Sequence, residues 1–120
     1  MSSFLLEFEG NRNDYINLIK NSEEDIVFKF TAEWCKPCKS IKNFLEEYFE
    51  ECQYQSVKCY EVDVDENFDL YAYLKTKKMI NGIPTLMHYI KENKDFVPTN
   101  SISGTDLKAI DLFFKKIWKL

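Results

Sequence analysis

The sequence predicts one α/β domain over residues 1–120, built on a central mixed β-sheet with helices on both faces. Three observations carry this prediction. Strand-like and helix-like segments alternate through most of the chain, which is typical of parallel strands joined by helices. Two strand-like segments then follow one another directly and indicate an antiparallel hairpin at the edge of the sheet. A chain of 120 residues is also long enough to close one hydrophobic core without a metal or disulfide staple.

The first part of the chain predicts strand, helix and strand. A short strand is expected at residues 5–8, followed by a helix at residues 11–20 whose apolar residues recur at helical spacing. Residues 25–30 follow as a second strand. Their run is apolar except for Lys29, which is the pattern of a central strand that is buried on both faces.

The middle of the chain predicts helix, strand and helix. A complete amphipathic stripe marks the second helix at Ile41, Phe44, Leu45, Tyr48 and Phe49. Residues 57–64 alternate sufficiently to form a strand. Leu70, Tyr71 and Leu74 then mark a short third helix.

The C-terminal part predicts a hairpin and a last helix. The hairpin strands are expected at residues 85–90 and 96–102, around a turn at residues 91–94. The last helix is expected to begin near Ser103, with Asp106 placed to complement its N-terminus. It should bury Leu107, Ile110, Phe114 and Ile117.

Composition and charge exclude several classes of function. The formal net charge of −4 argues against a nucleic-acid partner, because phosphates require a basic face. No apolar run approaches the roughly twenty residues that span a bilayer, so no membrane partner is expected. The N-terminus lacks the basic region of a secretory signal peptide. We therefore expect a cytoplasmic monomer whose four cysteines serve chemistry or packing rather than structural disulfides.

The pair Cys35 and Cys38 stands directly after the predicted buried strand, at the start of the second helix. The unpaired N–H groups and the positive end of a helix N-terminus stabilise a thiolate, which lowers its pKa and raises its reactivity toward disulfides. We expect Cys35 to be exposed, as a nucleophile must be, and Cys38 to be shielded one turn further in. Pro37 between them has no N–H to lose in the first turn.

A zinc site and inert thiols are the alternatives for the cysteines. A structural zinc site usually has four ligands, and beyond the pair this chain offers only Cys52, Cys59 and His88. His88 lies in a predicted buried strand, where a lone histidine is more often a satisfied core residue. Cys52 and Cys59 show no motif spacing and are interpreted as unreactive thiols. We therefore expect neither a metal nor another cofactor.

Two short motifs resemble signatures of a known family. Residues 30–39, F-T-A-E-W-C-K-P-C-K, resemble the active-site segment of the thioredoxin family. Residues 81–85, N-G-I-P-T, are similar to its second signature, a loop whose cis-proline faces the dithiol. Residues 61–65 resemble a strand of eukaryotic-type thioredoxins. The resemblance covers nearly the whole chain in matching order, and it implies a thioredoxin-like fold.

That resemblance implies roles for individual residues. Cys35 becomes the nucleophile, and Cys38 becomes the thiol that resolves the mixed disulfide. Pro84 becomes the cis-proline, and Ile83 before it offers backbone hydrogen bonds to an extended substrate peptide. The other positions of the expected substrate-binding surface are Trp34, Lys36, Pro37, Ile80 and residues 99–101. For Ile80, ordinary core packing is the alternative.

The sequence departs from the family pattern at four positions. Lys36 places a cation between the cysteines, and Asn100 stands where a glycine is usual. Asn43 replaces a helix-kinking proline, so we expect a straighter second helix. Lys29 occupies the place of a buried acid that the family uses to relay protons near the resolving cysteine.

Lys29 is expected to form an ion pair with Glu61, which stands where many thioredoxins have a lysine. The two charges would then be exchanged between neighbouring strands. A charge buried in the central strand without a partner would cost several kcal/mol. If paired, Lys29 would stabilise the Cys38 thiolate or accept its proton, and both charges would belong to the catalytic machinery. The alternative is that Lys29 extends its amine to the sheet edge while Glu61 faces water.

These features predict a thiol–disulfide oxidoreductase that reduces protein disulfides. Its partners would be disulfide-containing target proteins and a thioredoxin reductase or an equivalent electron donor. An isomerase or oxidant is a weaker alternative, because such proteins usually carry a histidine in the motif and a secretory signal. A thioredoxin-fold binding scaffold is the other alternative, although a pure scaffold needs neither the two cysteines nor Trp34 and the Ile83–Pro84 pair.

Overall fold

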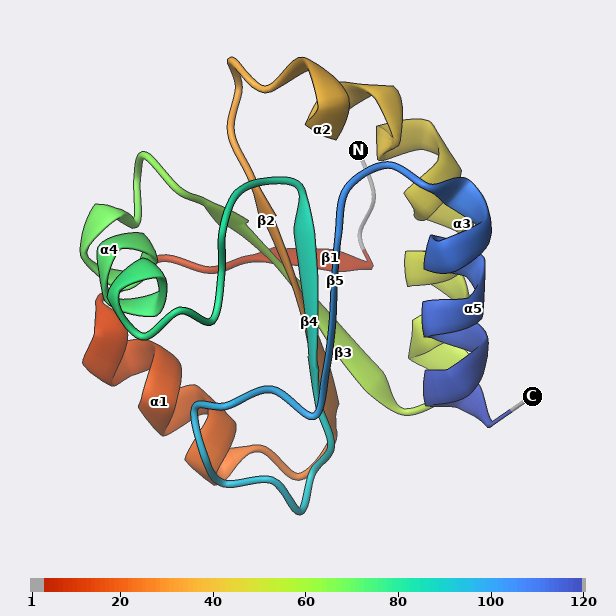
Figure 1. Ribbon diagram of the computed structural model, residues 1–120. Coiled ribbons are helices and arrows are strands. Elements are labelled where there is room, and N and C mark those ends of the chain that lie inside the picture. Colours follow the sequence, from red (N-terminus) through yellow and green to blue (C-terminus); the bar gives the residue numbers. More distant parts are fainter. Residues whose placement is uncertain (1–3, 120) are drawn as a thin grey trace.

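The computed structural model describes residues 4–119 as one β-sheet with helices on both of its faces (Figure 1). Residues 1–3 and 120, which belong to the expected single domain, lie outside the described residues. In chain order the elements are β1 (Leu5–Glu7), α1 (Arg12–Asn21), β2 (Asp25–Thr31), α2 (Lys36–Ser40), α3 (Lys42–Tyr54), β3 (Val57–Asp63), α4 (Phe68–Thr76), β4 (Thr85–Tyr89), β5 (Asn100–Ser103) and α5 (Leu107–Trp118). No helix of this described part is long and apolar enough to cross a membrane.

The sheet has the strand order β1-β3-β2-β4-β5 and is mixed, which confirms the predicted fold class. Strands β1, β3 and β2 are parallel, whereas β4 pairs antiparallel with β2, and β5 with β4. In the β2–β3 ladder Lys29 lies opposite Glu61. Paired positions on neighbouring strands project their side chains to the same face of a sheet, so this register places the two charges side by side.

Strand β2 is buried on both faces, as its apolar sequence predicts. Ile26, Phe28 and Phe30 pack into the core beneath α1 and α4, on the left of the sheet in Figure 1. Val27 packs into the other core, beneath α3 and α5 on the right. Because side chains alternate along a strand, Lys29 projects toward the α3 side.

The second helix is interrupted at Ile41, so the expectation of a straighter helix is wrong. Ile41 has φ −104° and ψ 0°, and it separates α2 from α3. The Ser40 hydroxyl donates to the Pro37 carbonyl at 2.7 Å, which is the acceptor that the Ile41 N–H would use in a continuous helix. The Ile41 N–H donates instead to the Lys39 carbonyl. A proline at position 43 is therefore not needed for the break.

The last strand and helix begin later than predicted. Strand β5 starts at Asn100 rather than at residue 96, because the segment before it is held by side-chain bonds instead of a ladder. The Tyr89 hydroxyl donates to the Phe96 carbonyl at 2.6 Å, and the Asn93 amide to the Val97 carbonyl at 2.9 Å.

Helix α5 starts at Leu107, one residue after its N-cap Asp106. The Asp106 carboxylate accepts the N–H groups of Lys108 and Ala109, which fixes the helix start there. Leu107 is 46% exposed, so the prediction that it is buried is wrong. It has the helical spacing of Ile110, Phe114 and Ile117, but it occupies the first helical position, before the buried part of the helix.

Candidate redox site

Cys35 and Cys38 form a disulfide at the start of α2, immediately beyond the end of β2. Cys35 is the N-cap of the helix, and the Cys38 backbone N–H donates to its sulfur at 3.2 Å. A hydrogen bond of this kind stabilises a thiolate when the disulfide is reduced. Pro37 occupies the first turn, where a missing N–H leaves no helical bond unmade.

Both cysteines are covered in the disulfide form. Cys38 is 1% exposed, as expected, but Cys35 is only 3% exposed, so the expectation of an exposed nucleophile is wrong for this state. The Cys35 sulfur is bonded to Cys38 and lies 4.0 Å from the Ile83 carbonyl oxygen, which closes two directions of approach.

A second loop faces the disulfide. Its Ile83–Pro84 peptide bond is cis, and the half-buried Ile83 turns its carbonyl toward Cys35. The Thr85 hydroxyl bonds the Gly82 carbonyl at 2.6 Å and shares a 2.7 Å hydrogen bond with the Ser103 hydroxyl. These bonds hold the loop at its base.

The residues of β5 that lie beside Pro84 are not the ones that the resemblance implied. The Gly104 N–H donates to the Pro84 carbonyl at 3.0 Å, and Gly104 has φ +99°, a conformation that a side chain would strain. The Thr99 N–H bonds the His88 carbonyl, at the opposite end of β4. Residues 99–101 therefore do not border the disulfide. Ser103 and Gly104 take that place, because Ser103 pairs with Thr85, the residue after Pro84.

The other expected docking residues divide between surface and core. Trp34 is 66% exposed, and its indole N–H donates to the Asp65 carboxylate at 2.8 Å, which orients the ring. Lys36 and Pro37 are exposed on α2. Ile80 is 3% exposed and packs in the core with the cysteines, so its assignment to the docking surface is wrong.

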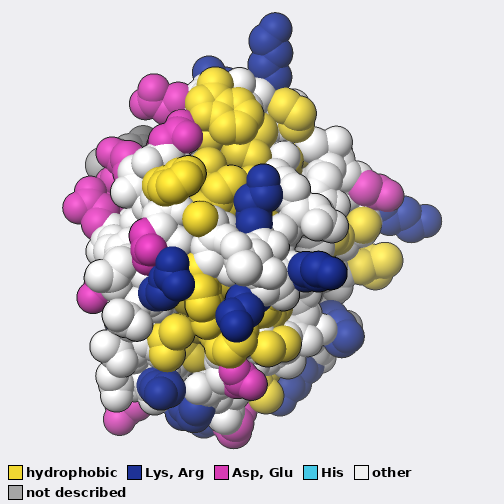
Figure 2. All heavy atoms as spheres, turned by 60° about the vertical axis from the view of Figure 1, so that its left-hand side comes forward, with side chains coloured by type: hydrophobic (Ala, Val, Ile, Leu, Met, Phe, Trp, Pro, Cys, Tyr) yellow, Lys and Arg dark blue, Asp and Glu magenta, His cyan; other side chains and the backbone are white. Residues whose placement is uncertain are grey.

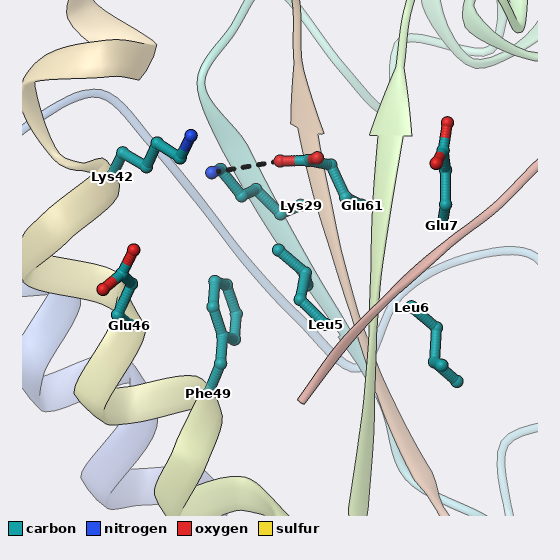
Figure 3. A pocket seen from close by; sticks show the side chains of 8 residues that line it. All are labelled: Leu5, Leu6, Glu7, Lys29, Lys42, Glu46, Phe49 and Glu61. Atoms are coloured by element: carbon teal, nitrogen blue, oxygen red, sulfur yellow. Dashed lines mark ion pairs between the residues drawn. The ribbon is translucent and has the colours of Figure 1, made fainter. Parts of the chain in front are cut away.

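Lys29 and Glu61 form a direct ion pair. The Lys29 amine lies 3.3 Å from a Glu61 carboxylate oxygen, and the two side chains are 3% and 38% exposed. The pair stands in a cavity of about 420 Å³ between the sheet and α3, into which Lys42 and Glu46 also project (Figure 3). The predicted ion pair is therefore confirmed, and the alternative, in which the amine extends to the sheet edge while Glu61 faces water, is wrong.

A neighbouring groove connects this pair to the resolving cysteine. It has a volume of about 310 Å³, and Cys38, Lys29 and Glu61 all line it. Sequence reasoning missed two further cations of this groove, Lys39 and Lys42, which α2 and α3 contribute. Their spacing from Cys38 along the chain was visible, but the interruption at residue 41 that aims Lys42 into the groove was not.

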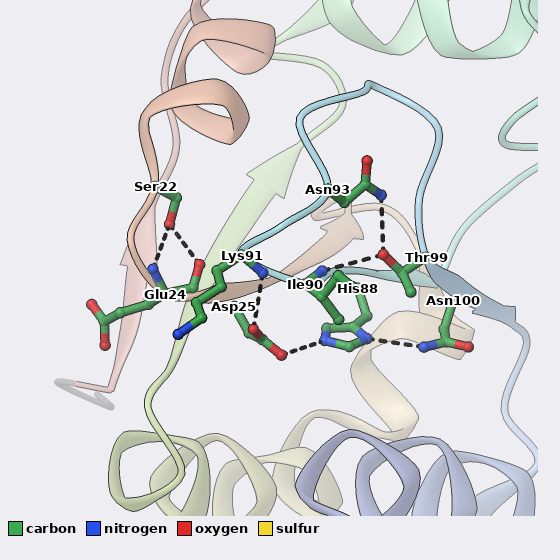
Figure 4. A network of polar contacts seen from close by, with 9 residues as sticks. All are labelled: Ser22, Glu24, Asp25, His88, Ile90, Lys91, Asn93, Thr99 and Asn100. Atoms are coloured by element: carbon green, nitrogen blue, oxygen red, sulfur yellow. Dashed lines mark hydrogen bonds and ion pairs between the residues drawn. The ribbon is translucent and has the colours of Figure 1, made fainter.

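The remaining candidate residues are structural. His88 is buried and lies between Asp25 and Asn100, with both ring nitrogens 3.0 Å from a partner, in the network of Figure 4. It is a satisfied core histidine. Cys52 and Cys59 are buried and free, and contact with Cys52 together with burial raises the pKa of the Cys59 thiol well above its ordinary value. No group of side chains over residues 4–119 is arranged to hold a metal ion.

This arrangement defines a dithiol–disulfide redox centre carried at the end of a buried strand. The sequence profile of the thioredoxin family matches residues 8–114. The chain is 32% identical over 112 residues to Thioredoxin 3 of Plasmodium falciparum, a match that covers 92% of this chain and 57% of that protein. It is 33% identical over 89 residues to the chloroplastic Thioredoxin M3 of rice, Oryza sativa, covering 74% of this chain and 46% of that protein.

The fold agrees with these matches. The structure of Trichomonas vaginalis thioredoxin superposes with a TM-score of 0.77 at 25% identity, covering 96% of this chain and 98% of that one. The chain therefore belongs to the thioredoxin family. It spans about half the length of the two curated relatives named above.

Proposed function

We propose that this protein is a thiol–disulfide oxidoreductase that reduces disulfides of other proteins through Cys35 and Cys38. The observation that carries the proposal is the Cys35–Cys38 disulfide at a helix start, facing the Ile83 carbonyl and beside an exposed Trp34. Membership of the thioredoxin family supports the same chemistry. A scaffold without redox activity is not favoured, because its docking function would not require this pair.

The proposed reaction has two exchange steps. In the reduced protein the Cys35 thiolate attacks one sulfur of the target disulfide, and the other target sulfur leaves as a thiolate. The Cys38 thiolate then attacks the Cys35 sulfur of the mixed disulfide, which closes the Cys35–Cys38 bond and releases the second target thiolate. The target gains two electrons and takes up two protons from water. A dithiol donor, such as a reductase, returns two electrons to the protein.

The surface around the disulfide supports this reaction by holding the target chain. Trp34 offers an exposed apolar ring, and the Ile83 backbone stands beside the Cys35 sulfur. Lys36 is exposed next to Cys35, and its positive charge favours the thiolate. Trp34 and Lys36 are the chain neighbours of Cys35, and Ile83 belongs to the loop that faces the disulfide.

Lys29 and Glu61 act as positioning residues for the second step. Both residues line the groove that Cys38 also lines, and the Lys29 side chain is buried there. A positive charge there favours the Cys38 thiolate, which is the attacking form. Glu61 in turn orients the lysine side chain through the ion pair.

The cytoplasm is the proposed compartment, and a monomer the proposed form. The two buried free thiols Cys52 and Cys59 suit a reducing environment. Cell fractionation with an antibody against the chain tests the first point, and light scattering of the purified protein tests the second.

The decisive experiment measures disulfide reduction with dithiothreitol as the electron source. Wild-type protein should accelerate the reduction of a protein disulfide, whereas the double variant Cys35→Ser/Cys38→Ser should not. Equal rates for the two proteins would reject the proposal. A Cys52→Ser/Cys59→Ser variant is the matched control, because it removes two thiols outside the site and should retain activity.

A further inference from the structure

A groove beside the redox disulfide carries an excess of negative charge. It has a volume of about 580 Å³ and is lined by Glu33, Trp34, Lys39, Asp63, Asp65 and Glu66. The groove that reaches Cys38 shares four of these residues, Glu33, Lys39, Asp63 and Glu66. We call the groove beside Trp34 the acidic groove, and it adjoins the groove that reaches the resolving cysteine.

The carboxylates of this groove are not neutralised within the protein. Within residues 4–119, no ion pair is formed by its four carboxylates, which belong to Glu33, Asp63, Asp65 and Glu66. Asp65 accepts the Trp34 indole N–H, and Asp63 accepts the backbone N–H groups of Asp65 and Glu66 at 2.8 and 3.2 Å. The side chains of Glu33 and Glu66 make no hydrogen bond within the described part of the chain, and both are exposed.

Like charges crowd around the Glu66 carboxyl. The charge of Asp63 raises the pKa of the exposed Glu66 carboxyl, and Glu7, Glu9 and Glu33 raise it further. Of the residues that the structure describes, Lys39 is the one cation that lines the groove beside Trp34. The local potential is therefore negative along a surface that a bound target must approach.

Basic side chains lie on a different part of the same face. Figure 2 shows acidic side chains gathered along one edge of the upper hydrophobic patch, where Figure 1 places the loop before α2. Lysine and arginine side chains lie over the middle and the opposite side of that view. The carboxylates thus gather on the Asp65 side of Trp34, where they can discriminate between targets by the charge of their flanking residues.

We propose that the acidic groove binds a target segment that carries lysine or arginine beside its reactive disulfide. The inference rests on the proposed function, because disulfide exchange requires a polypeptide to be held next to Cys35 and Trp34. Disulfide exchange therefore requires a target polypeptide at this place, and the carboxylates of the groove favour a target with a positive charge. A metal ion is not the occupant, since the described residues hold no cluster arranged to ligate one.

The test compares two disulfide-bridged peptides of equal length, one with lysine or arginine around the bridge and one with aspartate or glutamate. At low ionic strength the wild-type kcat/KM for the basic peptide should exceed that for the acidic peptide by about tenfold, because exposed charges at an interface chiefly steer association. The preference should fall steeply as salt is added. A neutral small disulfide, bis(2-hydroxyethyl) disulfide, reports on the redox chemistry alone.

Two charge-matched variants locate the effect. Glu33→Lys/Glu66→Lys replaces two negative charges of the groove by positive ones, and it should abolish or invert the preference for the basic peptide. Glu47→Lys/Glu50→Lys makes the same change in net charge on exposed positions of α3 that line neither groove, and it should leave the preference within about twofold of wild type.

Each outcome decides one claim. Equal rates for both peptides, or a preference for the acidic one, would overturn the inference. So would equal losses in the two variants, because the effect would then come from net charge and not from the groove. If wild-type protein reduces neither peptide nor the neutral disulfide, the proposed function itself fails.

Discussion

The ion pair between Lys29 and Glu61 predicts an asymmetry between its two partners. Replacing Glu61 by Gln should destabilise the protein, because it leaves a lysine that is 3% exposed without its counter-charge. Replacing Lys29 by Met should cost little or even stabilise. The methionine keeps the buried apolar stem, and the remaining Glu61 is 38% exposed and can be solvated.

The geometry sets the size of the Glu61→Gln effect. For the 3.3 Å separation, the attraction between unit charges is about 1 kcal/mol at the dielectric constant of water and about 5 kcal/mol at an effective value of 20. The open cavity and the partly exposed carboxylate place the pair toward the lower limit. We therefore expect Glu61→Gln to lower the free energy of unfolding by about 1–2 kcal/mol and Lys29→Met to change it by less than about 1 kcal/mol.

Urea unfolding of the oxidised protein measures both values. Stopped-flow traces give a second readout that a purely structural role would not move. Lys29→Met should slow the resolution of the mixed disulfide by Cys38 and leave the first attack by Cys35 nearly unchanged. A larger loss of stability in Lys29→Met than in Glu61→Gln would refute the electrostatic reasoning, and equal slowing of both steps, or of neither, would refute the positioning role.

Three further predictions follow from the site and the core. Cys38→Ser should accumulate a mixed disulfide with the target, visible by mass spectrometry, whereas Cys35→Ser should form no such adduct; turnover at the wild-type rate by Cys38→Ser would contradict the assigned roles. Lys36→Gly should lower the reduction potential of the pair by about 30 mV or less, measured against glutathione, because the exposed ammonium favours the thiolate but is screened; an unchanged or higher potential would contradict this. Burial lowers the pKa of His88 despite the Asp25 carboxylate, so the folded state disfavours its protonation. The stability that neutral His88 contributes should be fully present above about pH 6.5, the pKa of an unfolded histidine, and be lost as pH falls through the lower folded pKa. Thermal melts should therefore show that the melting temperature of wild type falls more steeply in this window than that of His88→Gln. Melting temperatures that fall in parallel for the two proteins would exclude the histidine as the cause.

Local patterns determined the fold class and the reacting pair. The apolar run of β2 predicts a strand buried on both faces, and the stripe after Cys38 predicts a helix directly beyond it. Together these two features place the dithiol at a helix start. The sequence could predict them because each depends only on residues close together in the chain. The Lys29–Glu61 contact was also accessible to sequence reasoning, since the resemblance aligned two strands whose register puts these residues opposite each other.

Errors arose where a backbone bond or a side-chain contact overrides the pattern. Ser40 takes the carbonyl that would continue the helix through Ile41, and no periodicity of apolar residues reports such a competition. The start of β5 depends on the hydrogen bonds that the Tyr89 and Asn93 side chains donate to backbone carbonyls of the segment before it.

Burial at the site was likewise decided only by the assembled structure. Ile80 and Cys35 have residue types and positions that fit either a surface or a core, and their 3% exposure follows from the way the cis-proline loop closes over the helix start. The acidic groove draws Glu33 from the loop after β2 and Asp63 and Glu66 from the end of β3. Its negative potential exists because parallel pairing brings the ends of these two strands together, and that proximity belongs to the sheet rather than to either segment.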